Sequence, residues 1–194
     1  KKTFLITGFN EKKLKQKILY KNINYIFNKN FHDKDMMHSL ILGLKKSKDD
    51  TIVSYTDIIY SSNILQKLKK IKLKQIAIPV NRDWKRIWKL RKKYHLNDAE
   101  SLIYNKSKKL LEIGKKINND PIAQFMGIIY IPKIKIKIIL NEYKKNNKKK
   151  IQVTQFLDNL IKTENIKVIE TKSFWYEFDD YTDLKEYEKF LNRS

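Results

Sequence analysis

The chain has 194 residues and a mass of 23.4 kDa, which fits one domain, and 41% of its residues are apolar, enough for a hydrophobic core. It contains no cysteine and only three scattered histidines, so any metal is expected to be a hard cation held by oxygen ligands. No apolar run reaches the roughly twenty residues that cross a bilayer, and no signal-peptide layout opens the chain, which predicts a cytoplasmic protein without membrane contact.

The formal net charge of +22 suggests a nucleic-acid partner, because clustered basic residues neutralise phosphates. However, only four of the 43 basic residues are arginines, and the lysines are spread over the whole chain. This distribution favours a solvated surface that attracts nucleotides and other anions over a specific nucleic-acid site. A basic nucleic-acid-binding protein stays an alternative.

Strands and helices alternate in the first part of the chain. The expected strands cover 4–7, 24–27, 51–55 and 75–80, and the expected helices cover 12–20, 36–44 and a segment beginning at Ser62. Asp35 and Ser62 are the expected helix caps, and Pro79 is expected to close the fourth strand. The alternation predicts a largely parallel sheet covered by helices on both faces.

After Val80 the pattern becomes less regular and more antiparallel. Expected helices cover 82–91, 153–161 and 182–191, and expected strands cover 101–104, 110–113, 125–131, 166–170 and 174–178. The segment 131–139 alternates Ile with Lys, which fits a strand, but it also has helical spacing, and we favour a helix. Thr182 is the expected N-cap of the last helix.

Two carboxylates far apart in the sequence both follow expected strands. Asp57 comes directly after the run 51–56, and Asp179 lies in the segment 175–180. In an α/β sheet, both side chains can point into one crevice at the carboxyl ends of the strands. Such a pair suits a divalent cation and a phosphate-bearing substrate, whereas either aspartate alone is equally typical of a helix cap or turn.

A series of short motifs in a fixed order carries a resemblance to a known family. The motifs are Thr7-Gly8-Phe9, 35–40, 56–61, Trp84 with Trp88 and Arg91, 98–101, 112–116, 124–127, 175–179 and Asp183-Leu184. Together they resemble the nucleotidyltransferase superfamily, with MobA-like, phosphocholine cytidylyltransferase-type and sugar-phosphate nucleotidyltransferases as the nearest members. The resemblance implies a Rossmann-like three-layer α/β/α fold with a mainly parallel, mixed central sheet and a small acceptor lobe. It implies one domain over 1–194, with 1–80 on the nucleotide side and 81–194 on the acceptor side.

One family motif is absent from this sequence. The family opens with a strand and a glycine-rich loop of the kind Gly-x-Gly-x-Arg, which closes around the triphosphate, whereas none of the glycines here forms such a cluster. The chain therefore corresponds to the family from its second strand onward. We expect an N-terminally truncated domain; a loop supplied by another chain and a noncatalytic nucleotide- or phospholigand-binding remnant stay alternatives.

The resemblance also implies a reaction and roles for individual residues. An acceptor phosphate attacks the α-phosphorus of a nucleoside triphosphate, with CTP favoured, and pyrophosphate leaves. Asp57 and Asp179 would hold Mg²⁺, and Lys116 with its neighbour Lys115 would face the acceptor phosphate. Because the chain is rich in lysine, both lysines are equally typical of a solvated surface.

The acceptor is expected to be phosphocholine, an aminoethylphosphonate or a sugar 1-phosphate, used in assembling cell-surface polysaccharides, lipid head groups or phosphonates. The remaining candidate acceptor residues are Asp98, Glu100, Gly127, Trp84, Trp88 and Trp175. Gly127 would allow a close backbone approach or mark a bulge. The tryptophans would form a cage for an ammonium group, or pack in the core as their helical spacing also predicts. The sequence predicts no oligomeric state.

Overall fold

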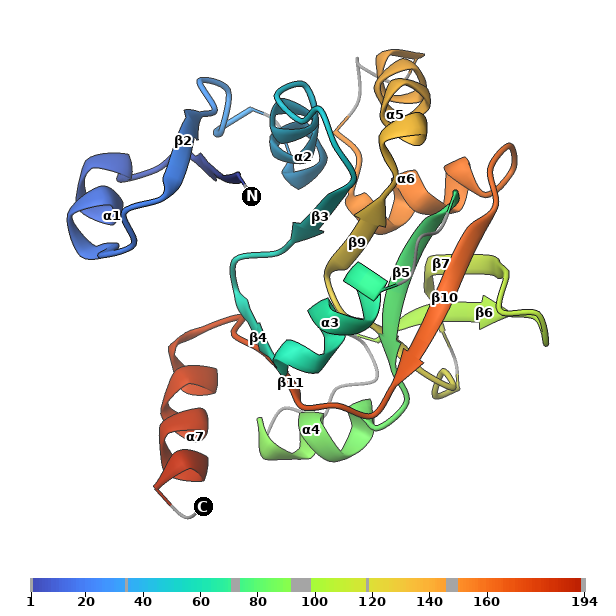
Figure 1. Ribbon diagram of the computed structural model, residues 1–194. Coiled ribbons are helices and arrows are strands. Elements are labelled where there is room, and N and C mark those ends of the chain that lie inside the picture. The colour runs from blue at the N-terminus through green and yellow to red at the C-terminus, as the bar shows by residue number, and fades with distance from the viewer. Residues whose placement is uncertain are drawn as a thin grey trace.

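The computed structural model describes residues 2–33, 35–70, 74–91, 99–117, 119–145 and 150–192. Its central sheet has five strands: β3 (Thr51–Ser54), β5 (Ile76–Asn81), β8 (Gln124–Phe125), β9 (Ile128–Ile131) and β10 (Ile166–Thr171). Four of them run in the order β10-β5-β9-β3, and β8 pairs with the end of β5 (Figure 1). β5 and β10 are parallel, whereas β9 is antiparallel to both β3 and β5, so the sheet is mixed.

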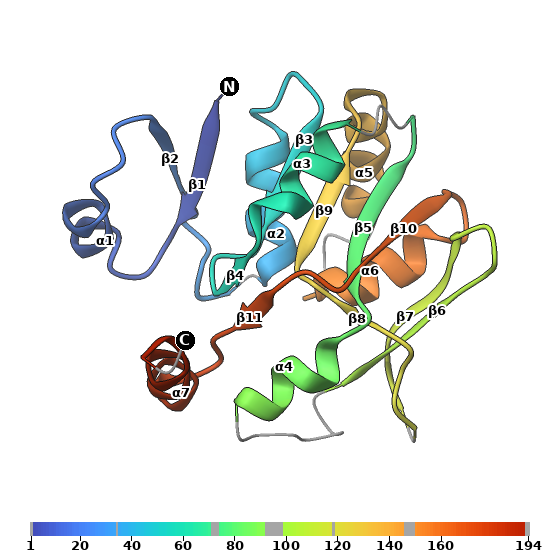
Figure 2. The ribbon, with the colours of Figure 1, turned by 60° about the horizontal axis from the view of Figure 1, so that its bottom comes forward.

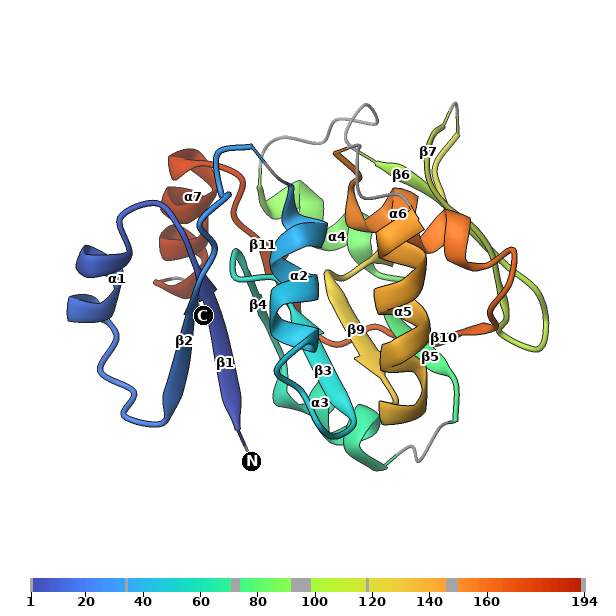
Figure 3. The ribbon, with the colours of Figure 1, turned by 90° about the horizontal axis from the view of Figure 1, so that it is seen from above.

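Helices cover both faces of this sheet. In Figures 2 and 3, α2 (Met36–Leu44), α5 (Lys133–Lys145) and α6 (Val153–Leu160) lie on one side and α3 (Ser62–Lys70) lies on the other. Successive side chains along a strand point to opposite faces of the sheet, and each face has its own hydrophobic core. Ile76 and Ile78 of β5 join the core under the first three helices, whereas Ala77 joins the core under α3 and α4 (Trp84–Leu90). The predicted three-layer α/β/α fold with a mixed sheet is confirmed. The expectation of a mainly parallel sheet needs correction, because among the described pairings of the central sheet β5–β10 is parallel, whereas β3–β9, β5–β9 and β5–β8 are antiparallel.

The first elements form a separate unit beside α2. β1 (Thr3–Thr7) and β2 (Ile23–Phe27) are parallel neighbours, with Leu5 opposite Tyr25, and α1 (Glu11–Lys17) connects them. Figure 3 shows this unit beside α2, on the β3 side of the central sheet. α1 ends at Lys17 rather than at Tyr20 and buries no residue.

Two antiparallel pairs complete the fold. β6 (Glu100–Tyr104) and β7 (Leu110–Lys116) form a hairpin that packs against α6. β4 (Ile58–Tyr60) pairs with β11 (Trp175–Glu177), and α7 (Tyr181–Leu191) follows β11. β4 was not predicted. None of the described helices combines the length and apolarity that crossing a bilayer requires.

Several local expectations are confirmed and others need correction. α2 covers the expected residues, with Asp35 accepting from the His38 amide, and the segment after Pro132 is helical as expected. The corrected positions are Pro79, Ser62, Thr182 and the strand expected over 125–131. Pro79 does not end its strand but lies fully buried inside β5, opposite Ile169 of β10.

The other three corrections concern element ends. Ser62 is the first helical residue of α3 rather than its flanking cap. Thr182 lies inside α7, whose N-cap is Asp180, because the Asp180 carboxylate accepts from the backbone N–H of Thr182 and Asp183. The expected strand 125–131 divides into β8 and β9 at Gly127, whose φ of +71° interrupts an extended strand.

Candidate active site

Asp57 and Asp179 lie at the same end of the β4–β11 ladder. Ile58 is the register partner of Glu177, and the backbone N–H of Phe178 donates to the Asp57 carbonyl at 2.9 Å, which extends the ladder by one residue. Asp57 is exposed, and the Asp179 side chain is 56% exposed. The structure thus brings the two predicted metal ligands to one edge, and their role in binding metal stays a prediction.

Arg91 and Asp183 form a buried ion pair that contacts Asp179. This pair was not predicted from the sequence. Arg91 directly follows α4, and its guanidinium donates from Nε to Oδ1 of Asp183 at 3.1 Å and from Nη2 to Oδ2 at 2.9 Å. Nη2 also contacts Oδ2 of Asp179, and the Asp179 N–H donates to Oδ2 of Asp183 at 2.9 Å. Burial acts to raise the pKa of Asp183, but the hydrogen bonds from Arg91 and from the backbone outweigh it and lower that pKa.

Both aspartates affect the pKa of the Glu177 carboxyl. Burial, followed by the negative charge of Asp179, raises the pKa of the Glu177 carboxyl to about 7, and Asp57 adds to the effect. Arg91, whose Nη1 lies 3.7 Å from Oε2 of Glu177, opposes the shift without cancelling it. Asp57, Glu177 and Asp179 therefore form an acidic group in a chain whose net charge is strongly positive.

Tyr55 links this acidic group to the hairpin. Burial raises the pKa of the Tyr55 hydroxyl, and the charges of Glu100, Glu177 and Asp57 raise it further. Tyr55 thus interacts with carboxylates from β6, from β11 and from the segment directly before β4. Its ring meets Phe125 edge-on at 6.0 Å between centroids, and its N–H donates to the carbonyl of Gly127 at 2.9 Å. No sequence motif marked Tyr55 as a site residue.

The surroundings of Gly127 and Glu100 follow from this arrangement. A Cβ on Gly127 would lie 2.8 Å from Cδ2 of Tyr55, so the tyrosine ring, rather than an open ligand site, fills the space beside the glycine. Of the two roles expected for Gly127, the structure shows the interruption between strands. Burial raises the pKa of Glu100, although the Thr154 hydroxyl, which donates to it at 3.3 Å, opposes the shift. Asp98 lies outside the described residues.

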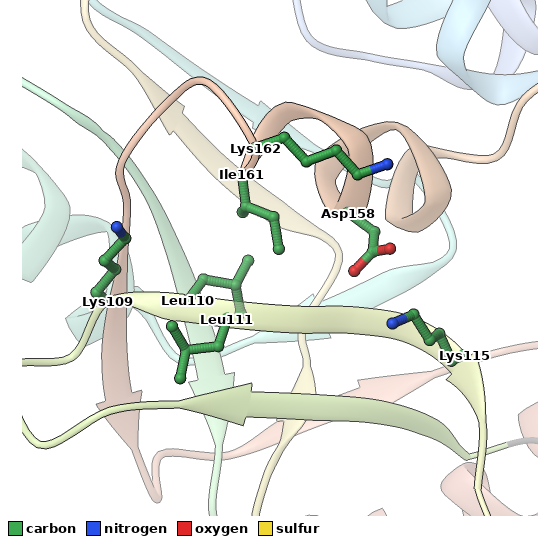
Figure 4. A pocket seen from close by; sticks show the side chains of 7 residues that line it. All are labelled: Lys109, Leu110, Leu111, Lys115, Asp158, Ile161 and Lys162. Atoms are coloured by element: carbon green, nitrogen blue, oxygen red, sulfur yellow. The ribbon is translucent and has the colours of Figure 1, made fainter.

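The two candidate lysines differ in their surroundings. Lys116 lies opposite Glu100 in the β6–β7 register, which places it near the acidic end of the hairpin. Lys115 pairs with Glu112 at 2.6 Å and lines a surface pocket of about 280 Å³ between β7 and α6, to which Asp158 also contributes (Figure 4). The hydrogen bond with Glu112 raises the pKa of Lys115, with further support from Asp158. Lys116 is therefore the better placed of the two to meet a ligand near Glu100.

The three candidate tryptophans are core residues. Trp84, Trp88 and Trp175 are 1%, 5% and 2% exposed, and all belong to the core under α3 and α4. The indole N–H of Trp84 donates to the carbonyl of Pro121 at 3.2 Å, and its ring packs edge-on against Trp88. An ammonium group would need access to an indole face, so the proposed aromatic cage is corrected to packing in the core.

The donors at the β4–β11 end fit a hard divalent cation. Asp57 and Asp179 are accessible carboxylates, and carboxylate oxygens are preferred by Mg²⁺. The described part of the chain contains no group of three or more His, Cys, Asp or Glu residues arranged to hold a metal ion. A cation at this position would therefore take only part of its coordination from protein carboxylates, which is typical of Mg²⁺ beside phosphates.

The known proteins to which this chain is similar are nucleotidyltransferases. No protein-family model matches the chain. The chain is 28% identical over 200 residues to a CTP:phosphoglutamine cytidylyltransferase of Campylobacter jejuni, covering 93% of this chain and 78% of that protein. Among solved structures, an inositol-1-phosphate CTP transferase from T. maritima superposes with a TM-score of 0.75 at 18% identity, covering 95% of this chain and 74% of that chain.

Two further solved structures share the fold. The CTP:phosphocholine cytidylyltransferase from Streptococcus pneumoniae superposes with a TM-score of 0.70 at 16% identity, covering 98% of this chain and 78% of that one. A putative glucose-1-phosphate thymidylyltransferase from Bacillus anthracis superposes with a TM-score of 0.72 at 14% identity, covering 98% of this chain and 76% of that one. The resemblance predicted from the motifs is confirmed: the chain has the nucleotidyltransferase fold and is similar in sequence to a cytidylyltransferase.

Proposed function

We propose that the chain is the catalytic part of a nucleotidyltransferase that transfers CMP from CTP to a phosphorylated small molecule. The observation that carries the proposal is sequence similarity to a cytidylyltransferase over 93% of the chain. The position of Asp57 and Asp179 at one end of the β4–β11 ladder supports it, because two carboxylates there would hold a divalent cation, and that cation would neutralise charge on a phosphate-bearing substrate.

The proposed reaction is a single phosphoryl-type displacement. An oxygen of the acceptor phosphate forms a bond to the α-phosphorus of CTP, the bond from that phosphorus to the bridging oxygen breaks, and pyrophosphate leaves with the electron pair. The product is a cytidine diphosphate conjugate of the acceptor. Such a step depends mainly on positioning and on stabilising negative charge.

The residues divide into groups with distinct tasks. Asp57 and Asp179 would hold Mg²⁺, which when bound neutralises charge on the phosphate oxygens. Lys116, opposite Glu100, would attract the acceptor phosphate as a point charge. Glu100 of the hairpin and Tyr55, whose pKa is raised by both Glu100 and the acidic group, would contact the rest of the acceptor. The proposal assigns the reaction to the cytoplasm, where CTP is available, and to the synthesis of activated precursors for surface polymers, lipid head groups or phosphonates.

The test is pyrophosphate release by the complete natural polypeptide that contains these residues. CTP and three other nucleoside triphosphates would be combined with phosphocholine, 2-aminoethylphosphonate, phosphorylated glutamine, inositol 1-phosphate and hexose 1-phosphates. We expect release with CTP and one acceptor, and its loss in Asp57→Asn. Asp49→Asn is a matched control. Asp49 is also an exposed aspartate, but it lies before the first residue of β3, whereas Asp57 follows the last one.

Two other outcomes would replace the proposal. If no pair of nucleotide and acceptor released pyrophosphate but the protein still bound nucleotides, a noncatalytic binding protein would be favoured. Silence together with salt-dependent binding to any duplex would favour a basic nucleic-acid-binding protein.

A further inference from the structure

Arg91 brings a buried positive charge to the turn between β11 and α7. The residue is 4% exposed, and its partner Asp183, in the first turn of α7, is fully buried. Two hydrogen bonds join the guanidinium to the two carboxylate oxygens, Nε to Oδ1 at 3.1 Å and Nη2 to Oδ2 at 2.9 Å. The guanidinium carbon also lies 5.6 Å from the centre of the Trp88 ring. The fork and the ring together fix the plane of the guanidinium.

Asp179 is held by this pair at two points. Its backbone N–H donates to Oδ2 of Asp183 at 2.9 Å, and its Oδ2 contacts Nη2 of Arg91. The remainder of the Asp179 side chain faces solvent, since 56% of it is exposed. An exposed carboxylate without such contacts would exchange among several rotamers, and ordering it at the moment of ligand binding would cost conformational entropy.

We propose that Arg91 is a positioning residue: together with Asp183 it holds the backbone and the carboxylate of Asp179 in the orientation that the transfer reaction uses. We call the three residues Arg91, Asp183 and Asp179 the arginine clamp. Arg91 is placed behind Asp179 and acts through it rather than on the substrate. The catalytic consequence rests on the proposed function, whereas the clamp itself is a property of the fold.

The clamp also joins α4 to α7. Arg91 follows α4 and Asp183 belongs to α7, so the ion pair joins two helices far apart in the sequence at the turn that carries Asp179. The backbone of Asp183 is held without Arg91, because its N–H donates to the Asp180 carboxylate and its carbonyl accepts from the Tyr176 hydroxyl. The Asp183 carboxylate, which accepts from the Asp179 N–H, is oriented by the two hydrogen bonds from Arg91. A lysine at position 91 would keep the charge but not the two-pronged contact.

The test compares Arg91→Lys with Ile87→Ala. Ile87 is a 1% exposed residue of α4 that belongs to the same core as Trp88 and has no place in the clamp. The first measurement is hydrogen exchange at the Asp179 amide, under conditions in which the β5 amides stay protected. We expect exchange at least tenfold faster in Arg91→Lys and unchanged in Ile87→Ala. The second is the Kd for Mn²⁺, measured by electron paramagnetic resonance, which we expect to rise about tenfold in Arg91→Lys only.

The outcomes separate the clamp from the proposed function. The clamp would be overturned if the Asp179 amide of Arg91→Lys exchanged at the wild-type rate. It would also be overturned if Ile87→Ala accelerated this exchange as much as Arg91→Lys does. Tighter Mn²⁺ binding in Arg91→Lys would also overturn it, because Arg91 would then compete with the cation for Asp179. Faster exchange in Arg91→Lys with no Mn²⁺ binding even in the wild type would support the clamp and count against the metal-dependent function.

Discussion

The ring of Tyr55 occupies the space that a side chain on Gly127 would need. A Cβ built on Gly127 would lie 2.8 Å from Cδ2 and 2.9 Å from Cγ of Tyr55, and Gly127 has a φ of +71°. The same contact holds Tyr55 beside Phe125, between the acidic group at the β4–β11 end and Glu100 of the hairpin. The backbone of Gly127 therefore helps to place the residue that links the two halves of the candidate site.

We expect Gly127→Ala to destabilise the protein by about 2 to 5 kcal/mol, the sum of a left-handed backbone cost and of overpacking against Tyr55. The free energy of unfolding in urea would measure the change. Gly43→Ala is the matched control: the nearest atom to its new Cβ is Cδ1 of Ile6 at 3.4 Å, and Gly43 lies in the last turn of α2, so we expect its stability to change by less than about 1 kcal/mol. Equal effects at both glycines would contradict the contact with Tyr55.

The elements that were predicted correctly carry their signals within a few residues. α2 combines an Asp35 cap with apolar residues at helical spacing, and its bounds were predicted without error. The apolar runs of β5 and β9 were also recognised as strands, although the position of Pro79 and the bounds 125–131 needed correction. Their alternate residues face two different cores, so the layered fold follows from local patterns. The resemblance to nucleotidyltransferases added the order of these elements.

The features that were missed depend on contacts between distant segments. β4 has three residues and exists because it pairs with β11, which lies more than a hundred residues later in the chain. The Arg91–Asp183 pair is one basic and one acidic residue in a chain rich in both, and only burial distinguishes it from a surface pair. Tyr55 shows little local signal, because two of the three carboxylates that raise its pKa, Glu100 and Glu177, come from strands that are distant in the sequence.

The raised pKa of Glu177 predicts an unusual dependence of stability on pH. Its pKa of about 7 in the folded protein exceeds the ordinary value of 4.5, so the folded state binds more protons than the unfolded state between these values. The contribution of Glu177 to stability is therefore greatest below about pH 4.5, falls as the pH rises toward about 7, and stays low above it.

We expect Glu177→Gln to be more stable than the wild type at pH 8 by on the order of 1–3 kcal/mol, and this advantage to shrink toward pH 4.5. Urea unfolding with EDTA present, from pH 4 to 8, would follow the difference without interference from metal ions. A difference that is independent of pH, or a wild type that is the more stable protein at pH 8, would contradict the raised pKa.

The start of α7 allows a comparison of two neighbouring cap candidates. Asp180 accepts hydrogen bonds from the N–H of Thr182 at 2.7 Å and of Asp183 at 3.2 Å, whereas Thr182 was the cap expected from the sequence. Asp180→Ala should cost about 1 kcal/mol of unfolding free energy, within a usual range of about 0.5–2 kcal/mol, and Thr182→Ala less than about 0.5 kcal/mol. Thermal unfolding of the two variants would show which residue caps α7. A larger loss of stability in Thr182→Ala than in Asp180→Ala would support Thr182 as the cap.

The burial of the tryptophans separates stability from acceptor recognition. Trp84 is 1% exposed, and its indole N–H donates to the Pro121 carbonyl, so Trp84→Phe leaves a cavity and an unpaired carbonyl. We expect a loss of on the order of 1–3 kcal/mol in stability. The KM for the acceptor should stay within about twofold of the wild type, since the Trp84 side chain is almost entirely shielded from solvent. Steady-state pyrophosphate release and urea unfolding on the same preparation would give both quantities.

Asp57→Asn should show the opposite profile, because Asp57 is exposed: activity lost and stability within about 0.5 kcal/mol of the wild type. The two variants together distinguish a residue that supports the fold from one that takes part in the reaction. A Trp84→Phe variant whose acceptor KM rises tenfold or more, with little loss of stability, would instead return Trp84 to the acceptor site. That result would require the core under α3 and α4 to open during the reaction, since the indole is otherwise shielded from solvent.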